Sequence, residues 1–472
     1  MPWRRRDIAI RRASMTTEDS HDLVKVFSRN PAFRAAEWEE LTTEENPFRR
    51  PVRPDDLEWL DYSKPMPVER VLMLSGLLGN RMLRNIYDTD LLYVAPTANA
   101  AAAQDHRDFY SDRNRTLGAQ AKPILERHLF TFLEGERETL PSTSFAGLSR
   151  YLHDYRDQRA AAPGEAFDAA LATKGRRESA TFLLLQLSAF LPASNAAIAR
   201  NAIGEYDVAH PGLRGLLLQE YGAWVADAEK YRALLADAEL KPTIGAYWQL
   251  YLNSSLARGN YVHYTASNHE KLYEFLGALL HKKIDEEVSR ARFAQVFAEG
   301  LGSTGGFFSR PATLDGAGLE EYLTALVAPL VETFGDEVVA GVHRGFADAA
   351  WLGDLWHSDL AAQVNWADRI EEYKEKAEKI DQHLTNENIE FDLDTFVETS
   401  AETSTTHVHD DHRLVMIEVG QMHFWNNVTH KIELNQGDKV LIPTSRLHGS
   451  TVLSGSCTYH QPIIPDEMFR QF

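Results

Sequence analysis

The spacing of apolar residues along this chain changes once, near residue 388, and that change constrains the fold more than any other feature. From about residue 140 to 380, apolar residues recur at helical spacing in long segments such as "SATFLLLQLSAFLP", separated by short Gly, Pro and Asn breaks. After residue 388 they alternate with a period of two, in short segments bounded by Gly and Asn turns. The pattern predicts a helical bundle followed by a small β-barrel or jelly roll.

The length of 472 residues is too great for one ordinary core, so we expect a multidomain α + β protein. Helical spacing also recurs before the bundle, in "MPVERVLMLSGLLGNRMLRNIYD" and "AQAKPILERHLFTFLEGE". The expected parts are a disordered arm at 1–20, a helical N-terminal domain at 21–138, a helical bundle at 139–384 and a β-barrel at 385–472.

The composition of the chain limits the cellular locations and the classes of binding partner that we expect. Asp and Glu outnumber Lys and Arg by 69 to 49, and the net charge of −20 argues against nucleic acid, whose phosphates attract positive charge. The basic opening "MPWRRRDIAIRRASM" lacks the apolar stretch of a secretory signal, and no apolar run has the length that spans a bilayer. The single cysteine, Cys457, excludes an intramolecular disulfide. We therefore expect a cytoplasmic protein without a membrane segment.

A histidine-rich stretch, "TTHVHDDHRLVMIEVG" at 405–420, opens one of the predicted strands. Residues two apart on a strand point to the same side, so His407 and His409 face one way and His412 does not. A third imidazole, His448, follows the Pro443 turn in "GDKVLIPTSRLHG". Three imidazoles suit a divalent first-row metal and leave coordination positions open.

The layout of these histidines resembles the two short motifs of the cupin family. His407, His409 and Gly420 fit the first motif, in which a Glu position is taken here by Arg413. The second motif is matched by Gly437, Pro443 and His448, with Ser445 where the family usually has Gly. The resemblance implies a cupin β-barrel with one Fe(II) per chain held by the three histidines, although zinc would bind such ligands too. Without the carboxylate the metal keeps its full charge, which favours an anionic or chelating substrate.

Arg413 has two expected roles, because it occupies the position of a lost metal ligand. It either pairs with Asp410 or Asp411 or holds a substrate carboxylate. His423, past Gly420, is expected to be exposed.

The bundle carries a second resemblance, in "AYWQLYLNSSLARGNYVHYTASNHEKLYEFLGALL" at 246–280. Together with the order of helical arm, bundle and cupin, this stretch resembles the N-nitrosourea-forming metalloenzymes of streptozotocin biosynthesis. The resemblance implies a haem-oxygenase-like helical bundle and a helical arm that forms a homodimer. In that family a diiron site in the bundle N-hydroxylates a methylated arginine guanidinium, and the cupin iron rearranges the product to make an N–N bond.

Most of the family's diiron ligands are replaced here. Glu220 and Asp315 match ligand positions, whereas Lys230 and Lys283 stand at two others. Ammonium groups repel metal ions at a few ångströms, so a diiron site of the usual kind is not expected. Glu220 and Asp315 are predicted to be remnants that pair with Lys230 or Lys283.

We therefore expect an iron-dependent cupin oxygenase that uses dioxygen to rearrange an N-hydroxylated guanidine or amino-acid substrate. Arg446 and Tyr459 match the family's residues on strands beside the site and are expected to orient that substrate. A separate N-hydroxylase would have to prepare it. Two alternatives stay open: a pseudoenzyme scaffold that binds a separate N-oxygenase, and a diiron N-oxygenase with atypical ligands.

Overall fold

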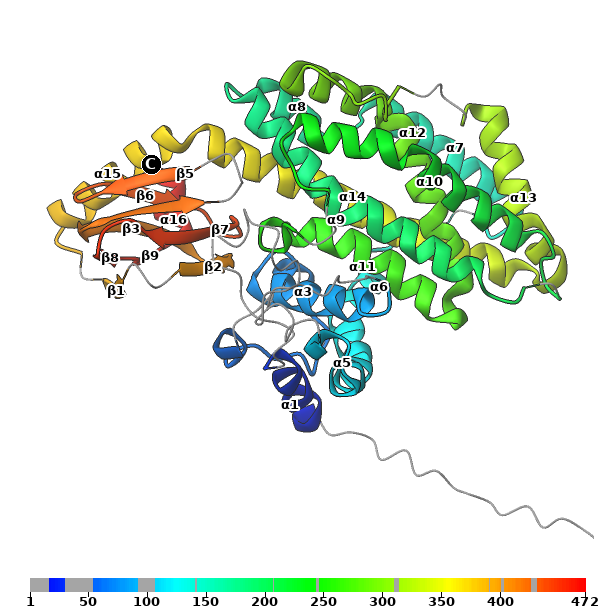
Figure 1. The fold of residues 1–472 in the computed structure, drawn as a ribbon, viewed down its shortest axis with the longest axis horizontal. Coiled ribbons are helices and arrows are strands. Elements are labelled where there is room, and N and C mark those ends of the chain that lie inside the picture. Colours follow the sequence, from blue (N-terminus) through cyan, green and yellow to red (C-terminus); the bar gives the residue numbers. More distant parts are fainter. Residues whose placement is uncertain are drawn as a thin grey trace, which may run out of the picture.

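Helices make up the first four-fifths of the chain and strands the last fifth (Figure 1). The computed structural model describes residues 17–29, 54–91, 107–140, 142–206, 208–242, 246–309, 314–389, 391–399, 403–425 and 431–472. Residues 1–16 of the expected disordered arm lie outside these ranges. Residues 17–20 belong to helix α1, so the arm was predicted to extend too far.

The N-terminal helices form their own small cluster, below the bundle in Figure 1. They are α1 (Thr17–Ser28), α3 (Leu74–Asp88), α5 (Asp112–Phe130) and α6 (Leu133–Glu136). Their core is continuous with the bundle, since Leu78 and Met82 of α3 belong to the same apolar cluster as Ala257 and Tyr261 of the bundle. The N-terminal helices therefore pack on the bundle as one body of protein.

The bundle is built from long helices that cross one another in the upper part of Figure 1. They are α7 (Phe145–Ala161), α8 (Glu165–Ala172), α9 (Arg176–Ala202), α10 (Leu213–Asp237), α11 (Asn253–Ser267), α12 (Leu272–Leu301), α13 (Gly316–Phe334) and α14 (Asp336–Asp368). Helix α15 (Ile370–Asn386) follows α14 but packs on the C-terminal strands, at the left of Figure 1. Short 3₁₀ turns precede α11 and α12 at Trp248–Leu250 and His269–Lys271. Local signals explain the ends: α12 stops where Gly302 adopts the left-handed conformation.

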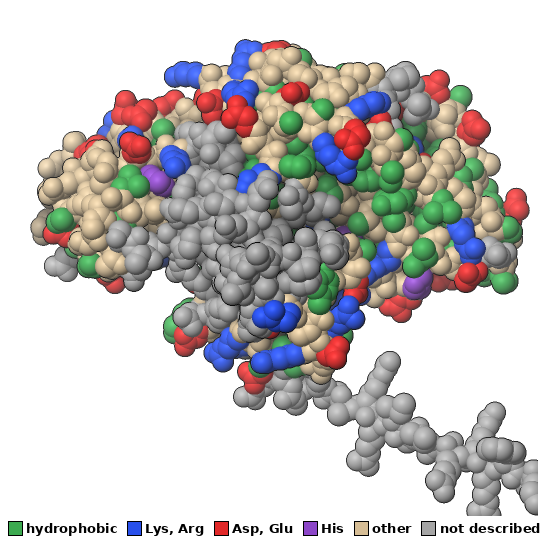
Figure 2. All heavy atoms as spheres, viewed as in Figure 1, with side chains coloured by type: hydrophobic (Ala, Val, Ile, Leu, Met, Phe, Trp, Pro, Cys, Tyr) green, Lys and Arg blue, Asp and Glu red, His purple; other side chains and the backbone are tan. Residues whose placement is uncertain are grey.

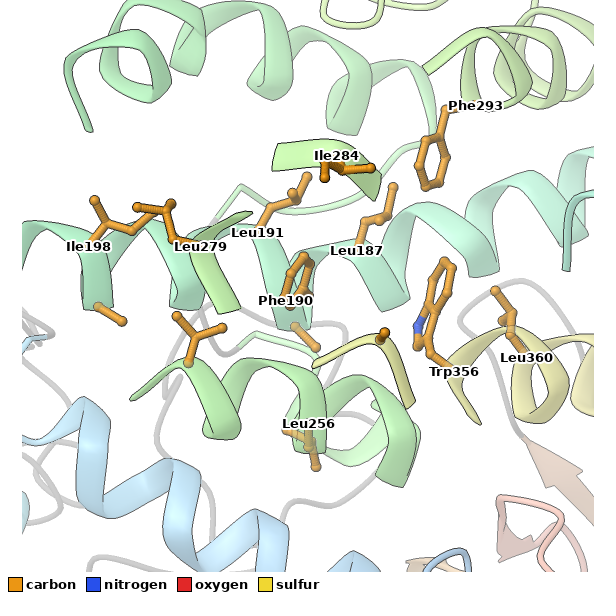
Figure 3. Close-up of a cluster of buried hydrophobic side chains, with 14 of the residues drawn as sticks. Leu187, Phe190, Leu191, Ile198, Leu256, Leu279, Ile284, Phe293, Trp356 and Leu360 are labelled. Carbon is orange, nitrogen blue, oxygen red and sulfur yellow. The ribbon is translucent and has the colours of Figure 1, made fainter. Parts of the chain in front are cut away.

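Helices α9, α11, α12 and α14 enclose the bundle core, which Figure 3 shows in close-up. Leu187, Phe190 and Leu191 of α9 belong to the same buried apolar cluster as Leu256 of α11 and Trp356 of α14. Removing such side chains from water is the main favourable term for folding. Helices α12 and α14 approach closely because Gly345 lacks a side chain: a Cβ there would lie 1.9 Å from the Glu274 carbonyl oxygen.

Helix α9 is the one described helix whose length and composition would also suit a membrane span. Its most apolar window is 78% buried inside the protein, so its apolar residues pack in the bundle core. A cytoplasmic location stays a prediction.

The C-terminal strands form two antiparallel sheets that face each other, at the left of Figure 1. The first has the order β1-β8-β3-β6 with β9 beside β3, and the second has the order β2-β7-β4-β5. Their bounds are β1 (Thr395–Thr399), β2 (Thr403–His407), β3 (His412–Val419), β4 (Gln421–Trp425), β5 (Lys431–Asn435), β6 (Lys439–Ile442), β7 (His448–Val452), β8 (Ser456–His460) and β9 (Ile463–Ile464), with α16 (Asp466–Gln471) last. This is a cupin-like β domain, and the expected joining of a helical part to a cupin is confirmed.

The side chains of β3 point alternately to the two faces of its sheet. Val415 and Ile417 belong to the core between the sheets, whereas Leu414 and Met416 pack outside with helix α15. The turn after β3 requires glycine, because Gly420 has φ +98° and a Cβ there would lie 2.4 Å from the Ser456 carbonyl oxygen. That requirement accounts for Gly420 in the first cupin motif.

Candidate metal centre

Three imidazoles converge at one end of the sheet that contains β2 and β7. His407 ends β2, His448 begins β7, and the two residues lie directly opposite each other in the antiparallel pair. His409 follows two residues after β2 has ended rather than on the strand itself, a departure from the expected strand phase. The ligand atoms of all three lie within 4.8 Å of one another. Their ring centroids are 4.6 to 5.1 Å apart.

The hydrogen bond of His448 decides which of its ring nitrogens can bind a metal. Its Nδ1 lies 2.9 Å from the Arg446 carbonyl oxygen, which can only accept, so Nδ1 carries the proton. Nε2 therefore keeps a free lone pair. It is buried and has no hydrogen-bond partner in the described part of the chain. A backbone acceptor on one nitrogen commonly orients a metal-binding histidine.

The electrostatics keep the rings of His409 and His448 neutral. Burial, together with the neighbouring His407, lowers the pKa of His448 to about 3. Burial and the neighbouring His407 and His448 rings also hold the pKa of His409 well below its usual value. The Nε2 of His409 is likewise buried with no partner in the described ranges. Neutral imidazoles with unused lone pairs are the donors that a first-row divalent metal requires, so these residues fit such an ion.

His412 lies outside the group of three imidazoles, as expected, but the reason is not strand phase, because His407 ends β2 whereas His412 begins β3. Its Nδ1 accepts a hydrogen bond from the Thr444 backbone N–H at 3.0 Å, and its ring stacks on Phe469 of α16 at 3.7 Å. His423 was expected to be exposed, and that expectation is wrong. It lies on β4, between β5 and β7, and is buried.

Arg413 lies on the same side of β3 as Val415 and Ile417, which face the barrel interior. Its positive charge helps to depress the pKa of His409. Nη1 donates to Asp394 Oδ2 at 2.9 Å and to the Gln461 carbonyl at 3.0 Å. The expected pairing of Arg413 with Asp410 or Asp411 is therefore wrong. Asp394 reaches Arg413 from the segment before β1, which no local spacing could indicate.

The two other residues expected to orient substrate have protein partners. Arg446 precedes β7 rather than lying on a strand; it is buried and contacts Asp359 of α14, with Nη2 3.4 Å from Oδ1. Tyr459 on β8 donates to Glu398 Oε1 at 2.8 Å and stacks with Phe396. A role for either residue in substrate binding stays a prediction.

The remnant diiron positions are occupied by internal contacts. Lys283 Nζ lies 2.6 and 2.7 Å from the two carboxylate oxygens of Glu220, so the expected Glu220 pairing is present. Lys230 instead pairs with Asp227 at 2.9 Å. The predicted pairing of Asp315 with a lysine is wrong. Asp315 is the exposed N-cap of α13, accepting from the Gly318 N–H at 2.8 Å.

Within the described ranges, one group of His, Cys, Asp or Glu side chains is arranged so that it could hold a metal ion. It consists of His407, His409 and His448. The bundle contributes no second such group from the residues that the structure describes. Glu220, which was expected to be a remnant of a diiron site, is thus engaged by an ammonium group in this chain.

Sequence reasoning missed the helical side chains that contact the metal-binding strands. Arg81 of α3 and Gln363 of α14 are both almost fully buried and reach the residues just before His407 and His448. The available signal was a polar residue inside an apolar helical stretch, as in "SGLLGNRMLRNIYD" and "LAAQVNW".

Fold and site together define a helical bundle joined to a cupin-like domain that bears a group of three histidines able to hold a metal ion. No family model matches the chain. Along nearly its whole length it is similar to nitrosourea synthase of Streptomyces achromogenes subsp. streptozoticus, with 29% identity over 447 residues, which cover 93% of this chain and 94% of the relative. The resemblance to a nitrosourea-forming enzyme is confirmed.

Proposed function

We propose that this protein is an oxidoreductase that forms an N–N bond, and that the reaction takes place at an iron ion held by His407, His409 and His448. The substrate class is an N-hydroxylated guanidine or amino acid, and dioxygen is the oxidant. The single observation that carries the proposal is the convergence of three imidazole donors in a chain that is similar to nitrosourea synthase along nearly its whole length.

The protein's own residues account for binding and orientation. The three imidazoles hold the ion through neutral nitrogens, and the His448 Nδ1–H is fixed by the Arg446 carbonyl. When bound, Fe(II) would offer open coordination positions to substrate and dioxygen and would supply the redox chemistry. Three neutral ligands leave its charge unneutralised, which favours an anionic substrate group.

Arg413 is the described residue best placed to add specificity for a carboxylate. It faces the barrel interior, and its Nε has no hydrogen-bond partner among the described residues. A guanidinium presents donors in a planar fork that matches a carboxylate. Asp394 holds Nη1, so the rest of the fork is available for an amino-acid carboxylate.

The bundle supports a division of labour between two enzymes. Because Glu220 is bound to Lys283, the bundle position is not arranged for N-hydroxylation in this chain. The proposed substrate would then come from a separate N-hydroxylase.

Metal counting combined with product analysis tests the proposal. The wild-type protein should bind one Fe(II) per chain and convert an N-hydroxylated methylarginine to an N-nitroso product in air. His407→Ala should bind none and form no product while keeping the wild-type circular dichroism spectrum. Absence of a bound metal in the wild type would favour the scaffold role. Two metals per chain that persist in His407→Ala would favour a metal site in the bundle.

A further inference from the structure

The two strands that carry metal ligands are held from outside the cupin by side chains of the helical part. Thr406, just before His407, is bound by Arg81 of α3. Leu447, just before His448, is bound by Gln363 of α14. Each contact is separated from its ligand by one peptide unit, so a shift in the contact would move the imidazole.

Strand β2 has special need of such support. It is the edge strand of its sheet, paired with β7 alone, and its register is irregular between Ser404 and His407. An edge strand has unpaired backbone groups on one side. Arg81 supplies the missing partner there: Nη1 donates to the Thr406 carbonyl at 2.6 Å and Nη2 to the Thr406 hydroxyl at 2.8 Å.

The contact between Arg81 and Thr406 is buried and involves a charged group, so its hydrogen-bond geometry is restricted. Both Arg81 and Thr406 are 1% exposed. Nη2 of Arg81 also donates to the Gln249 carbonyl at 3.2 Å, and the Thr406 hydroxyl donates to the same oxygen. Burial lowers the pKa of Arg81 to about 9, so the guanidinium stays protonated at neutral pH. A buried cation must keep its acceptors, so Thr406 has little freedom to move.

Gln363 holds the other ligand strand much as a neighbouring strand would. Its Nε2 donates to the Leu447 carbonyl at 2.8 Å, and its Oε1 accepts from the Leu447 N–H at 3.0 Å. One turn earlier on α14, Asp359 contacts Arg446, whose carbonyl accepts from His448 Nδ1. Ser254 of α11 donates to Asp359 Oδ2 at 2.7 Å.

We propose that Arg81 and Gln363 are positioning residues for the metal centre: by fixing Thr406 and Leu447 they hold His407 and His448 in the geometry that binds the ion. The helical part of the chain thereby sets the metal affinity of the cupin. The inference rests on the proposed function, since it requires that the three histidines bind a metal.

Cobalt(II) titration of the full-length chain tests the inference, because Co(II) reports its ligand geometry in its visible absorption. Gln363→Met removes both hydrogen bonds to Leu447 while keeping the side-chain volume. Thr406→Val removes only the hydroxyl that Arg81 contacts and keeps a β-branched residue on β2. Substitution of residues that orient metal ligands commonly lowers metal affinity about 10- to 100-fold, and we expect a loss of that size with a changed Co(II) spectrum in both variants.

Asn201→Leu is the matched control, since it also removes a buried amide. Asn201 donates to the Ala266 carbonyl at 2.9 Å, near the end of α11 that points away from the cupin. It should lower the melting temperature without changing the Co(II) affinity or spectrum. If Gln363→Met and Thr406→Val bind Co(II) as Asn201→Leu does, the positioning role is wrong.

The outcomes separate this inference from the proposed function. Wild-type protein that binds no Co(II), or binds it equally well as His407→Ala, would reject both. Normal binding by the wild type and by both positioning variants would reject the inference alone. If Gln363→Met does not fold, Thr406→Val carries the test, because it deletes no more than one hydroxyl.

Discussion

The cupin site and the remnant position in the bundle differ in what their polar atoms do. In the cupin, the Nε2 atoms of His409 and His448 are buried without a partner in the described chain. In the bundle, both carboxylate oxygens of Glu220 are bound by Lys283. Buried polar groups normally find partners. Two unused imidazole nitrogens that converge with a third histidine suit a ligand, whereas carboxylate oxygens that are already bound by an ammonium group suit a structural role.

The two positions therefore differ within this chain, which is similar to nitrosourea synthase along nearly its whole length. Replacing one metal ligand by lysine supplies in one step the positive charge that the remaining carboxylate needs. The fold of the bundle can persist after such a change, because its apolar core does not depend on the ligands. The comparison predicts that the two regions respond differently to substitution.

The largest effect is expected at the cupin, from paired histidine variants. His409→Ala should abolish stoichiometric Fe(II) binding, because it removes one of only three donors. His412→Ala should leave it nearly unchanged, because that ring stacks on Phe469 outside the donor set. Metal content after desalting provides the measurement. Loss of metal in both variants would mean that the ligand set has been misassigned.

Acid should weaken the bundle through its own buried histidines. Burial lowers the pKa of both His281 and His357 to about 3. Below pH about 6.5 the unfolded chain takes up protons that the folded chain does not, so stability is lost as the pH falls from 6.5 toward 3. Each histidine contributes a slope of up to about 1.4 kcal/mol per pH unit.

Urea unfolding at pH 7, 6, 5 and 4 checks this dependence. His357→Gln should reduce the slope of unfolding free energy against pH, between pH 6 and 4, by the contribution of one proton. This expectation does not depend on how the substitution changes stability at pH 7. An unchanged slope would show that His357 titrates normally in the folded protein.

Breaking the remnant pair should cost about 2 kcal/mol of unfolding free energy. Lys283→Met leaves Glu220, whose side chain is 15% exposed, without its ammonium partner. The cost falls below that of a fully buried pair because Lys283 is 27% exposed and water screens the charge. Adding Glu220→Leu to this variant should recover part of the lost stability, because the protein then contains no buried carboxylate without a cationic partner. A double variant less stable than Lys283→Met would contradict the assignment of Glu220 as a purely structural charge.

The smallest expected effect is a stabilisation in the cupin. Ser445 has φ +61°, in the left-handed region, where the related family usually has glycine. Ser445→Gly relieves that strain but also increases the conformational entropy of the unfolded chain. The expected net gain in unfolding free energy is up to about 1 kcal/mol. Thermal unfolding measures it, and a loss of stability would show that the serine side chain has a favourable contact.

The sequence predicted those features whose cause is local. Period and turn residues indicated helices followed by strands, and the spacing of His407, His409 and His448 indicated the donor set before any geometry was known. The pairing of Glu220 with a lysine was expected from the family's ligand positions and from the need of a buried carboxylate for a cation, but the sequence left Lys230 and Lys283 both open as the partner.

Features that depend on distant contacts could not be predicted. Arg81 and Thr406 are 325 residues apart, and no spacing links them. Arg413 was predicted to pair with a carboxylate close in sequence, Asp410 or Asp411. Its partner in the structure is Asp394, which lies in the segment before β1. His423 was placed in a turn because Gly420 precedes it, yet the chain re-enters the sheet at once as β4.

Asp410 has a consequence for anyone who wishes to recombine these domains. Its Oδ1 accepts from the backbone N–H of Leu74 at 2.9 Å, so the loop between β2 and β3 caps the first turn of α3. A cut at the change from helix to strand near residue 388 would separate this carboxylate from the helix end it satisfies. A chimaera that exchanges the cupin should therefore carry along the matching faces of α3 and α14, and grafts designed by sequence boundary alone should lose affinity for metal before they lose their fold.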